Sequence, residues 1–281
     1  MYRSLNAGMV NVDVSFKELL PLAKKHKFGA VECDVLRIKE ESGLEHAIDL
    51  MGQNGIILSS FGLPVSVQGN TDDFNSSFVK LESSAQFARA LGCQRSATYI
   101  FSWHDELDFA ENFKQHVYRL RLCAEVLEAY GITLALEFLG PKTLMDGKKY
   151  KFIHSLEGML ELCDAIGTGN MNILLDAYHC YTAGMQSGDF AEIIRSQKDI
   201  GVVHINDAPK GQAVETLPDT LRYLPGDGGA MDVSGFLSSL KKVGYTGPVV
   251  CEPFSEKLKS MDDSDAKIRL VESSFDRVWP D

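Results

Sequence analysis

Gly131-Ile-Thr-Leu-Ala-Leu-Glu-Phe138 is the stretch that decides the fold. It opens on glycine, the residue that most often follows a helix, and continues as a short, mainly apolar run. Neighbouring strand residues point to opposite faces, so Leu134, Leu136 and Phe138 share one face and Glu137 lies on the other. The bulky apolar face belongs against helices, which turns Glu137 into the interior of a barrel, near the carboxyl end of its strand.

Seven further runs of similar character are spaced along the chain, and amphipathic segments lie between several of them. In one such segment Val117, Leu120, Ala124 and Leu127 recur at helical spacing. The predicted strands are 4–8, 29–35, 55–61, 95–101, 131–138, 171–177, 200–206 and 247–252, and the predicted helices are 16–25, 78–91, 113–130, 156–166 and 233–243.

This alternation, without a break in composition, predicts an α/β fold: a single (β/α)8 TIM barrel that takes up residues 1–281 as one domain. The alternative is a doubly wound open sheet. It is less favoured because no glycine-rich phosphate loop follows the first predicted strand.

Charge and composition limit the expected partners. Lys and Arg number 28 against 39 Asp and Glu, a net charge of −11, so we expect no nucleic-acid binding. No apolar run approaches the roughly 18 residues of a membrane span, and the first residues have no signal core, so we expect no membrane association and a cytoplasmic protein. The six cysteines form no Cys-x-x-Cys pair, which favours buried thiols over disulfides.

Four successive predicted strands end in a side chain that can bind metal: Glu137, Asp176, His204 and Glu252. Neighbouring strands lie about 4.8 Å apart, so ligands from such an arc can converge on one ion. Three buried carboxylates would otherwise repel one another and take up protons. A lone strand-end acid is more often a structural hydrogen-bonding group, but four in succession predict one divalent metal. We expect Mn²⁺, with Mg²⁺, Co²⁺ and Zn²⁺ as alternatives.

Two long segments, 139–154 and 207–231, follow predicted strands and should lie at the carboxyl end of the barrel, where barrel active sites are found. They and their neighbours supply further candidates. We expect His179, Lys210, Arg222 and Trp103 to contact substrate, and Asp207 to orient either His204 or its own loop. The plainer alternatives are a helix cap for His179, a surface lysine for Lys210, a loop anchor for Arg222 and an ordinary core residue for Trp103.

The ordered motifs resemble the xylose isomerase-like TIM-barrel superfamily, and most of all its keto-inositol isomerase branch. The resemblance covers nearly the whole chain. The motifs that carry it are Glu137-Phe-Leu-Gly140, Leu175-Asp-Ala-Tyr-His179, His204-Ile-Asn-Asp207, Arg222-Tyr-Leu-Pro-Gly-Asp-Gly228 and Cys251-Glu252.

This resemblance implies that Glu137, Asp176, His204 and Glu252 bind the metal and that Glu137 and Glu252 form the acid/base pair. Ketohexose 3-epimerases are similar too, but they have a second Glu where this chain has Thr143 and an Arg where it has Lys210. The tri-zinc endonuclease branch needs extra histidines, which this acidic chain lacks on its second and third strands.

The expected reaction is isomerisation or epimerisation of a keto-inositol or ketose through an enediolate, in which carboxylates move the proton and the metal stabilises the charge. One alternative is a lyase on the same site, which would dehydrate a keto-polyol or eliminate a group β to a 3-keto sugar. Another is a metal or sugar binder without catalysis. The expected partner is a small sugar or cyclitol, and homo-oligomer formation stays open.

Overall fold

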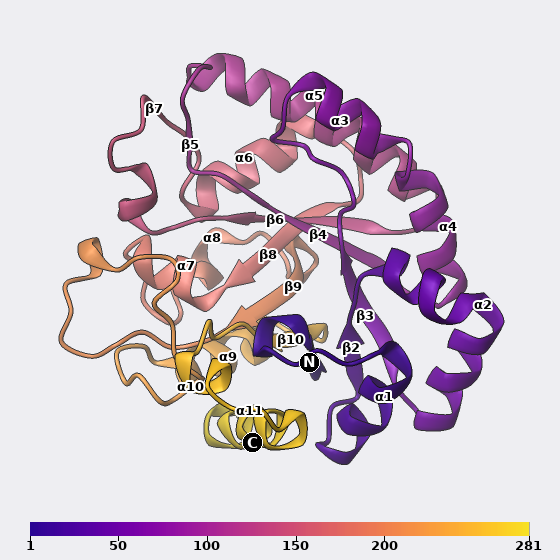
Figure 1. Ribbon diagram of the computed structural model, residues 1–281. Coiled ribbons are helices and arrows are strands. Elements are labelled where there is room, and N and C mark those ends of the chain that lie inside the picture. The colour runs from indigo at the N-terminus through magenta and orange to yellow at the C-terminus, as the bar shows by residue number, and fades with distance from the viewer. Residues whose placement is uncertain (281) are drawn as a thin grey trace.

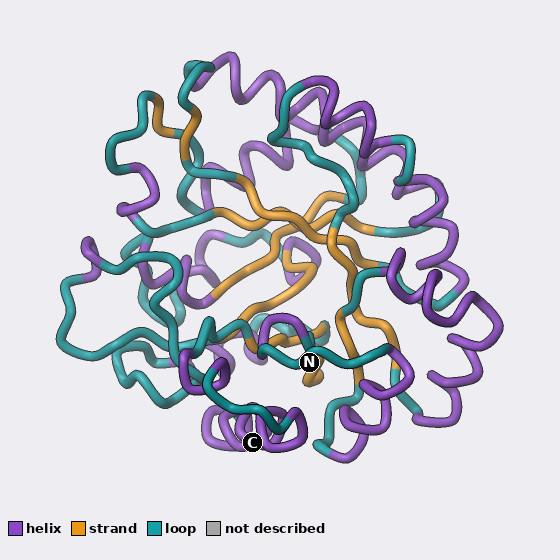
Figure 2. The backbone as a smooth tube through the Cα atoms, in the orientation of Figure 1, coloured by secondary structure: helices purple, strands orange, loops and turns teal. Residues whose placement is uncertain are grey.

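Eight parallel strands close into a barrel in the computed structural model, which describes residues 1–280 (Figures 1 and 2). Their order around the barrel is β1-β10-β9-β8-β6-β4-β3-β2. The closed order confirms the predicted barrel and rules out the open sheet. The strands are β1 (Tyr2–Leu5), β2 (Ala30–Glu32), β3 (Ile57–Gly62), β4 (Arg95–Ile100), β6 (Thr133–Phe138), β8 (Met171–Asp176), β9 (Ile200–Ile205) and β10 (Pro248–Cys251).

Helices surround the barrel, and among residues 1–280 none combines the length and apolar character needed to cross a membrane (Figure 1). They are α1 (Phe16–Lys25), α2 (Val35–Asn54), α3 (Thr71–Phe78), α4 (Leu81–Ala90), α5 (Phe109–Ala129), α6 (Leu156–Ile166), α7 (Ala177–Thr182), α8 (Phe190–Ile193), α9 (Val233–Lys242), α10 (Glu256–Lys259) and α11 (Ser264–Val278).

The predicted helices 16–25 and 156–166 match α1 and α6, and the helix predicted at 78–91 is confirmed as α4, which begins three residues later than expected, at Leu81. Helix α3, which precedes α4, was not predicted, and Asn70 caps its start by accepting a hydrogen bond from the Asp73 amide. Helices α2 and α11 were not predicted. A kink at Gly43, whose φ is +67°, interrupts any regular pattern in α2.

The barrel interior is filled by small and medium apolar side chains. Ala135, Leu174 and Val202 form a buried cluster on which Ala97 packs. Ala135 lies on the same face of β6 as Glu137, two residues further along, so the face of β6 that carries Glu137 is the interior face. This apolar layer separates two polar ends of the barrel.

The two long segments meet beyond the carboxyl ends of the strands. Thr143 donates a hydrogen bond from Oγ1 to the Leu217 carbonyl (3.1 Å), and Lys142 pairs with Glu215 at 3.8 Å. The first segment also contributes β7 (Tyr150–Lys151), which pairs antiparallel with β5 (Trp103–His104) outside the barrel. These contacts build a wall on one side of the barrel mouth.

Candidate metal centre

Glu137, Asp176, His204 and Glu252 come together at one point of the barrel mouth. One ligand atom of each lies within 4.8 Å of the corresponding atoms of the others. Glu137 is the next-to-last residue of β6, and Asp176 is the last residue of β8. His204 is the next-to-last residue of β9, and Glu252 follows β10 directly. Parallel strands present their carboxyl ends at the same rim, so four strands deliver four ligands without any irregular backbone.

The side chains fit a divalent cation. Glu137 Oε1 and both ring nitrogens of His204 are buried and have no hydrogen-bond partner among the described residues. His204 Nδ1 faces Glu252 Oε2 at 3.4 Å and Glu137 Oε1 at 3.8 Å, so the unpartnered atoms point at one common centre. Buried polar atoms of native proteins rarely lack a partner, and a bound cation would satisfy Glu137 Oε1 and one ring nitrogen of His204 together.

The charges of the metal-free cluster conflict with one another. Burial and the nearby Glu252 carboxylate raise the pKa of Glu137 well above its usual value. Burial alone would lower the pKa of His204, but the carboxylates of Glu252 and Glu137 raise it to about 10. Burial would likewise raise the pKa of Glu252, yet Arg222 and His204 lower it to about 2. Both shifts favour protonation of Glu137 and His204, and a bound divalent cation would oppose both by supplying positive charge at the same place.

Arg222 is the buried cation of the site. Its Nη1 donates to Glu252 Oε2 (2.7 Å) and to Asp176 Oδ2 (3.0 Å), and its Nη2 donates to Asp219 Oδ1 (2.6 Å). The guanidinium carbon lies 4.9 Å from the ring centroid of Tyr178 and 4.6 Å from that of Phe254. Arg222 therefore anchors the mouth loop to two of the candidate ligands, and this position favours the loop-anchor interpretation over direct substrate contact.

His179 also lies beside the cluster. The Gly140 amide donates to its Nδ1 at 3.3 Å, and its Nε2 lies 3.7 Å from Glu137 Oε1. Burial lowers the pKa of His179 to about 3, so the ring is neutral, and its Nε2 also lies 3.3 Å from Arg222 Nη2. A side chain at Gly140 would collide with the His179 carbonyl, since a Cβ there would be 2.2 Å from that oxygen. Glycine thus lets β6 and α7 approach closely enough to place this ring.

Asp207 orients its own loop and does not orient His204. Its carboxylate accepts hydrogen bonds from the amides of Gly228, Gly229 and Met231 at 2.8–3.1 Å, and it forms none with His204. Of the two roles expected for Asp207, the structure favours the loop. This carboxylate ties the far end of the segment 207–231 back to the barrel rim.

Replacing Asp207 by Ala should loosen that segment. Four charge-assisted hydrogen bonds would be lost, since the Ala208 amide also donates to this carboxylate (2.8 Å). We therefore expect a loss of roughly 3 kcal/mol in the free energy of unfolding and faster amide exchange across residues 208–231. Urea denaturation and hydrogen–deuterium exchange would measure both effects. Asp227→Ala is the matched control, because Asp227 is more exposed and pairs with Arg277 alone. Equal exchange in the two variants would contradict this role.

Two expected substrate contacts are not brought to the cluster. Lys210 is exposed, and its side chain forms no hydrogen bond or ion pair with any residue from 1 to 280. Next to it, Pro209 pairs with Gly229 in an isolated bridge that fixes the local chain direction. Trp103 is half-buried in β5, stacks on Phe101 with ring centroids 5.4 Å apart, and has Lys148 Nζ 3.3 Å from its ring centroid.

The structure adds two neighbours that were not predicted, Tyr99 and Asp219. Tyr99 pairs with Glu137 in the register of β4 and β6 and therefore shares its interior face, where it is 46% exposed at the open mouth. The alternation along 95–101 could have identified it. Asp219 reaches the site from an irregular loop, and no periodic signal marks it. Glu32 ends β2 as a buried acid that accepts hydrogen bonds from Asn6 (2.8 Å) and Ser60 (2.5 Å).

Comparisons with known proteins agree on fold and family. The sequence profile of a family described as xylose isomerase-like TIM barrel matches residues 20–273. A solved xylose isomerase domain protein from Alicyclobacillus acidocaldarius superimposes with a TM-score of 0.87 at 28% identity, covering 99% of this chain and 98% of that one. The IOLI protein, whose crystal structure holds a zinc atom, superimposes with a TM-score of 0.80 at 20% identity, covering 99% and 98%.

Curated relatives align over a shorter region. An inosose isomerase of Halalkalibacterium halodurans is 30% identical over 146 residues, which cover 51% of this chain and 47% of that protein. An inosose isomerase of Bacillus subtilis is 25% identical over 155 residues, 55% of this chain and 52% of that protein. The matched region thus spans about half the length of each relative.

Proposed function

Because the chain belongs to the family of xylose isomerase-like TIM barrels, we propose that it is a divalent-metal-dependent isomerase or epimerase of a small keto-polyol, a keto-inositol or a ketose. Two curated relatives are named inosose isomerases, which supports the cyclic substrate. The observation that carries the proposal is the convergence of three carboxylates and one imidazole, with unpartnered atoms on Glu137 and His204, at the mouth of the barrel.

In this proposal Glu137, Asp176, His204 and Glu252 hold the ion, and Mn²⁺ is the ion that we expect. When bound, such an ion would polarise the substrate carbonyl and offset the negative charge that develops when the neighbouring carbon loses a proton. The hydroxyl-rich substrate would enter past Tyr99, on the open side of the mouth.

The chain's own groups would then move the proton. Glu252 is held in place by Arg222 Nη1, so its carboxylate can accept the proton from the carbon beside the carbonyl. Glu137 has an unpartnered oxygen in the same site and can return a proton from another direction. Neutral His179, whose Nε2 lies 3.7 Å from Glu137 Oε1, stands close enough to form a hydrogen bond with a substrate oxygen. Return to the opposite face of the same carbon gives epimerisation, and return to the neighbouring carbon gives isomerisation.

An activity screen in D₂O tests this proposal. The protein would be loaded in turn with Mn²⁺, Mg²⁺, Co²⁺ or Zn²⁺ and given keto-inositols, ketohexoses or 3-keto glycosides. We expect deuterium at carbon in a product of otherwise unchanged mass, loss of turnover when a chelator removes the ion, and recovery when Mn²⁺ is returned. A product lighter by a leaving group would identify the lyase alternative, and no turnover with any ion would leave only the binder.

A further inference from the structure

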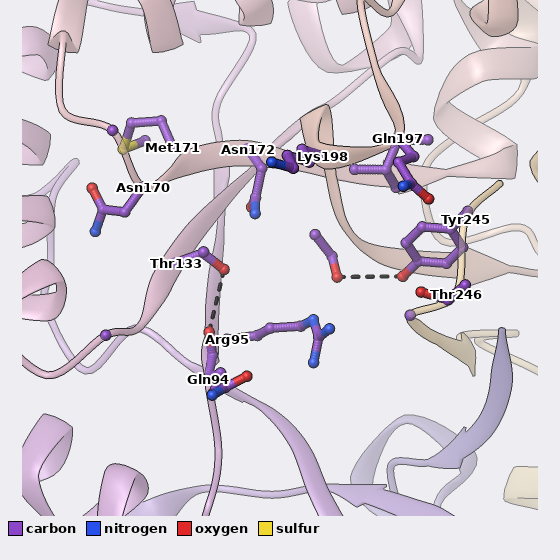
Figure 3. Close-up of a pocket in the computed structure, with 15 residues that line it drawn as sticks. Gln94, Arg95, Thr133, Asn170, Met171, Asn172, Gln197, Lys198, Tyr245 and Thr246 are labelled. Atoms are coloured by element: carbon purple, nitrogen blue, oxygen red, sulfur yellow. Dashed lines mark hydrogen bonds between the residues drawn. The ribbon is translucent and has the colours of Figure 1, made fainter. Parts of the chain in front are cut away.

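A second polar cavity lies at the opposite end of the barrel (Figure 3). It has a volume of about 450 Å³ and is lined by residues at or just before the amino-terminal ends of β4, β6, β8, β9 and β10. Asn172 lines it on β8, the strand that carries Asp176 four residues later. At a rise of about 3.3 Å per residue, the cavity is roughly 13 Å from the metal-ligand cluster, beyond the apolar interior layer. It is therefore a separate site.

The cavity is cationic in a chain of net charge −11. Arg95 and Lys198 line it, and no Asp or Glu is among its lining residues. The guanidinium of half-buried Arg95 extends toward the middle of the cavity in Figure 3 and forms no hydrogen bond or ion pair within the described chain. An arginine that faces such a cavity without a carboxylate favours an anion as its partner.

The cavity also contains a buried amide without a partner. Asn172 is 7% exposed, and its Oδ1 forms no hydrogen bond within residues 1–280. The amide packs against Gly201, where a Cβ would be 2.2 Å from Oδ1, so only glycine at that position leaves room for it. Nearby, the Tyr245 hydroxyl donates its proton to the carbonyls of Pro248 (2.8 Å) and Gly201 (3.3 Å), which leaves its oxygen able to accept. Both the Asn172 Oδ1 atom and the Tyr245 hydroxyl oxygen can accept a hydrogen bond from a hydroxyl group of a ligand.

From these contacts we infer that the amino-terminal end of the barrel binds a small hydroxylated anion, a polyol phosphate or a sugar acid, with its oxyanion on Arg95 and a hydroxyl group on Asn172. The volume lies within the range of small-molecule sites. Exposed Lys198, at the rim, adds a second positive charge to attract the anion. The inference does not depend on the reaction at the metal-ligand cluster.

Calorimetric titration of the full chain tests this, with glycerol 3-phosphate, glycerate, inorganic phosphate and glycerol as probes. Each is titrated into both metal-loaded and chelator-treated protein, because phosphate can bind a metal ion directly. We expect saturable binding of glycerol 3-phosphate, glycerate or both in the two forms, weakened by added salt, and none of glycerol. Whichever anion binds more tightly identifies the preferred oxyanion.

Variants locate the site. Arg95→Met should weaken binding at least about tenfold, because a charged hydrogen-bonding partner is lost. Arg89→Met, which removes an exposed charge on α4, should change nothing. Asn172→Leu should abolish the preference for glycerol 3-phosphate over inorganic phosphate. If Arg95→Met does not fold, binding by Lys198→Met and Asn172→Leu tests the location of the site. Lys198→Met should weaken binding about threefold.

Three results would overturn the inference. They are the absence of saturable binding by either hydroxylated anion, binding that disappears when the metal is removed, and equal affinities in the wild-type protein and in every cavity variant that folds.

Discussion

Glu137→Gln and Glu252→Gln should each stop solvent deuterium from entering the substrate, with a rate loss of about 100-fold to 10 000-fold. Gln has the shape of Glu and an oxygen that can still approach the cation, but it cannot take up the substrate proton at neutral pH. Since the proposed reaction needs a proton removed and a proton returned, loss of either carboxylate should interrupt it. Mass spectrometry of the product in D₂O measures this directly.

His204→Gln is the control that separates proton transfer from metal binding. Both ring nitrogens of His204 lack hydrogen-bond partners among residues 1–280, so its replacement removes no hydrogen bond from the protein. We expect this variant to lose affinity for the ion and to recover exchange in excess Mn²⁺, while the Glu variants do not recover. Exchange retained by both Glu variants would refute their assignment as the acid/base pair.

Arg222→Met should cost about 3–5 kcal/mol in the free energy of unfolding of the metal-free protein. The substitution keeps a long apolar side chain between Tyr178 and Phe254 but leaves Asp176, Glu252 and Asp219 without their shared cation. A divalent ion would restore part of that positive charge. The loss should therefore be smaller when Mn²⁺ is bound, and stability should depend more strongly on the metal than it does in the wild-type protein.

Urea denaturation with a chelator and with Mn²⁺ measures the two losses. Arg277→Met serves as control, because Arg277 belongs to a more exposed pair with Asp227 and should contribute less than about 1 kcal/mol. If Arg222→Met costs no more than Arg277→Met without metal, Arg222 does not compensate the buried carboxylates.

Contacts between residues that are distant in sequence placed the parts of the site that local sequence patterns did not predict. Arg222 and Asp219 lie in a segment without periodicity, and their places depend on the Asp207 carboxylate and on the Thr143–Leu217 hydrogen bond, which join residues distant in sequence. Lys210 lies in the same irregular segment and is exposed, so its expected contact with substrate stays a prediction. Helix α2 was missed because Gly43 breaks its pattern.

The sequence by itself determined the barrel, its family and the convergence of four metal-competent side chains. These follow from a two-residue alternation and from eight repeated units, and a closed parallel sheet must place all strand ends at one rim. The family match over residues 20–273 confirms the resemblance read from the motifs. Only the tertiary structure decided that Arg222 compensates the cluster, that Asp207 holds the loop and that a cationic cavity lies at the far end. Each of these arises from side chains on different segments that meet only after the barrel has closed.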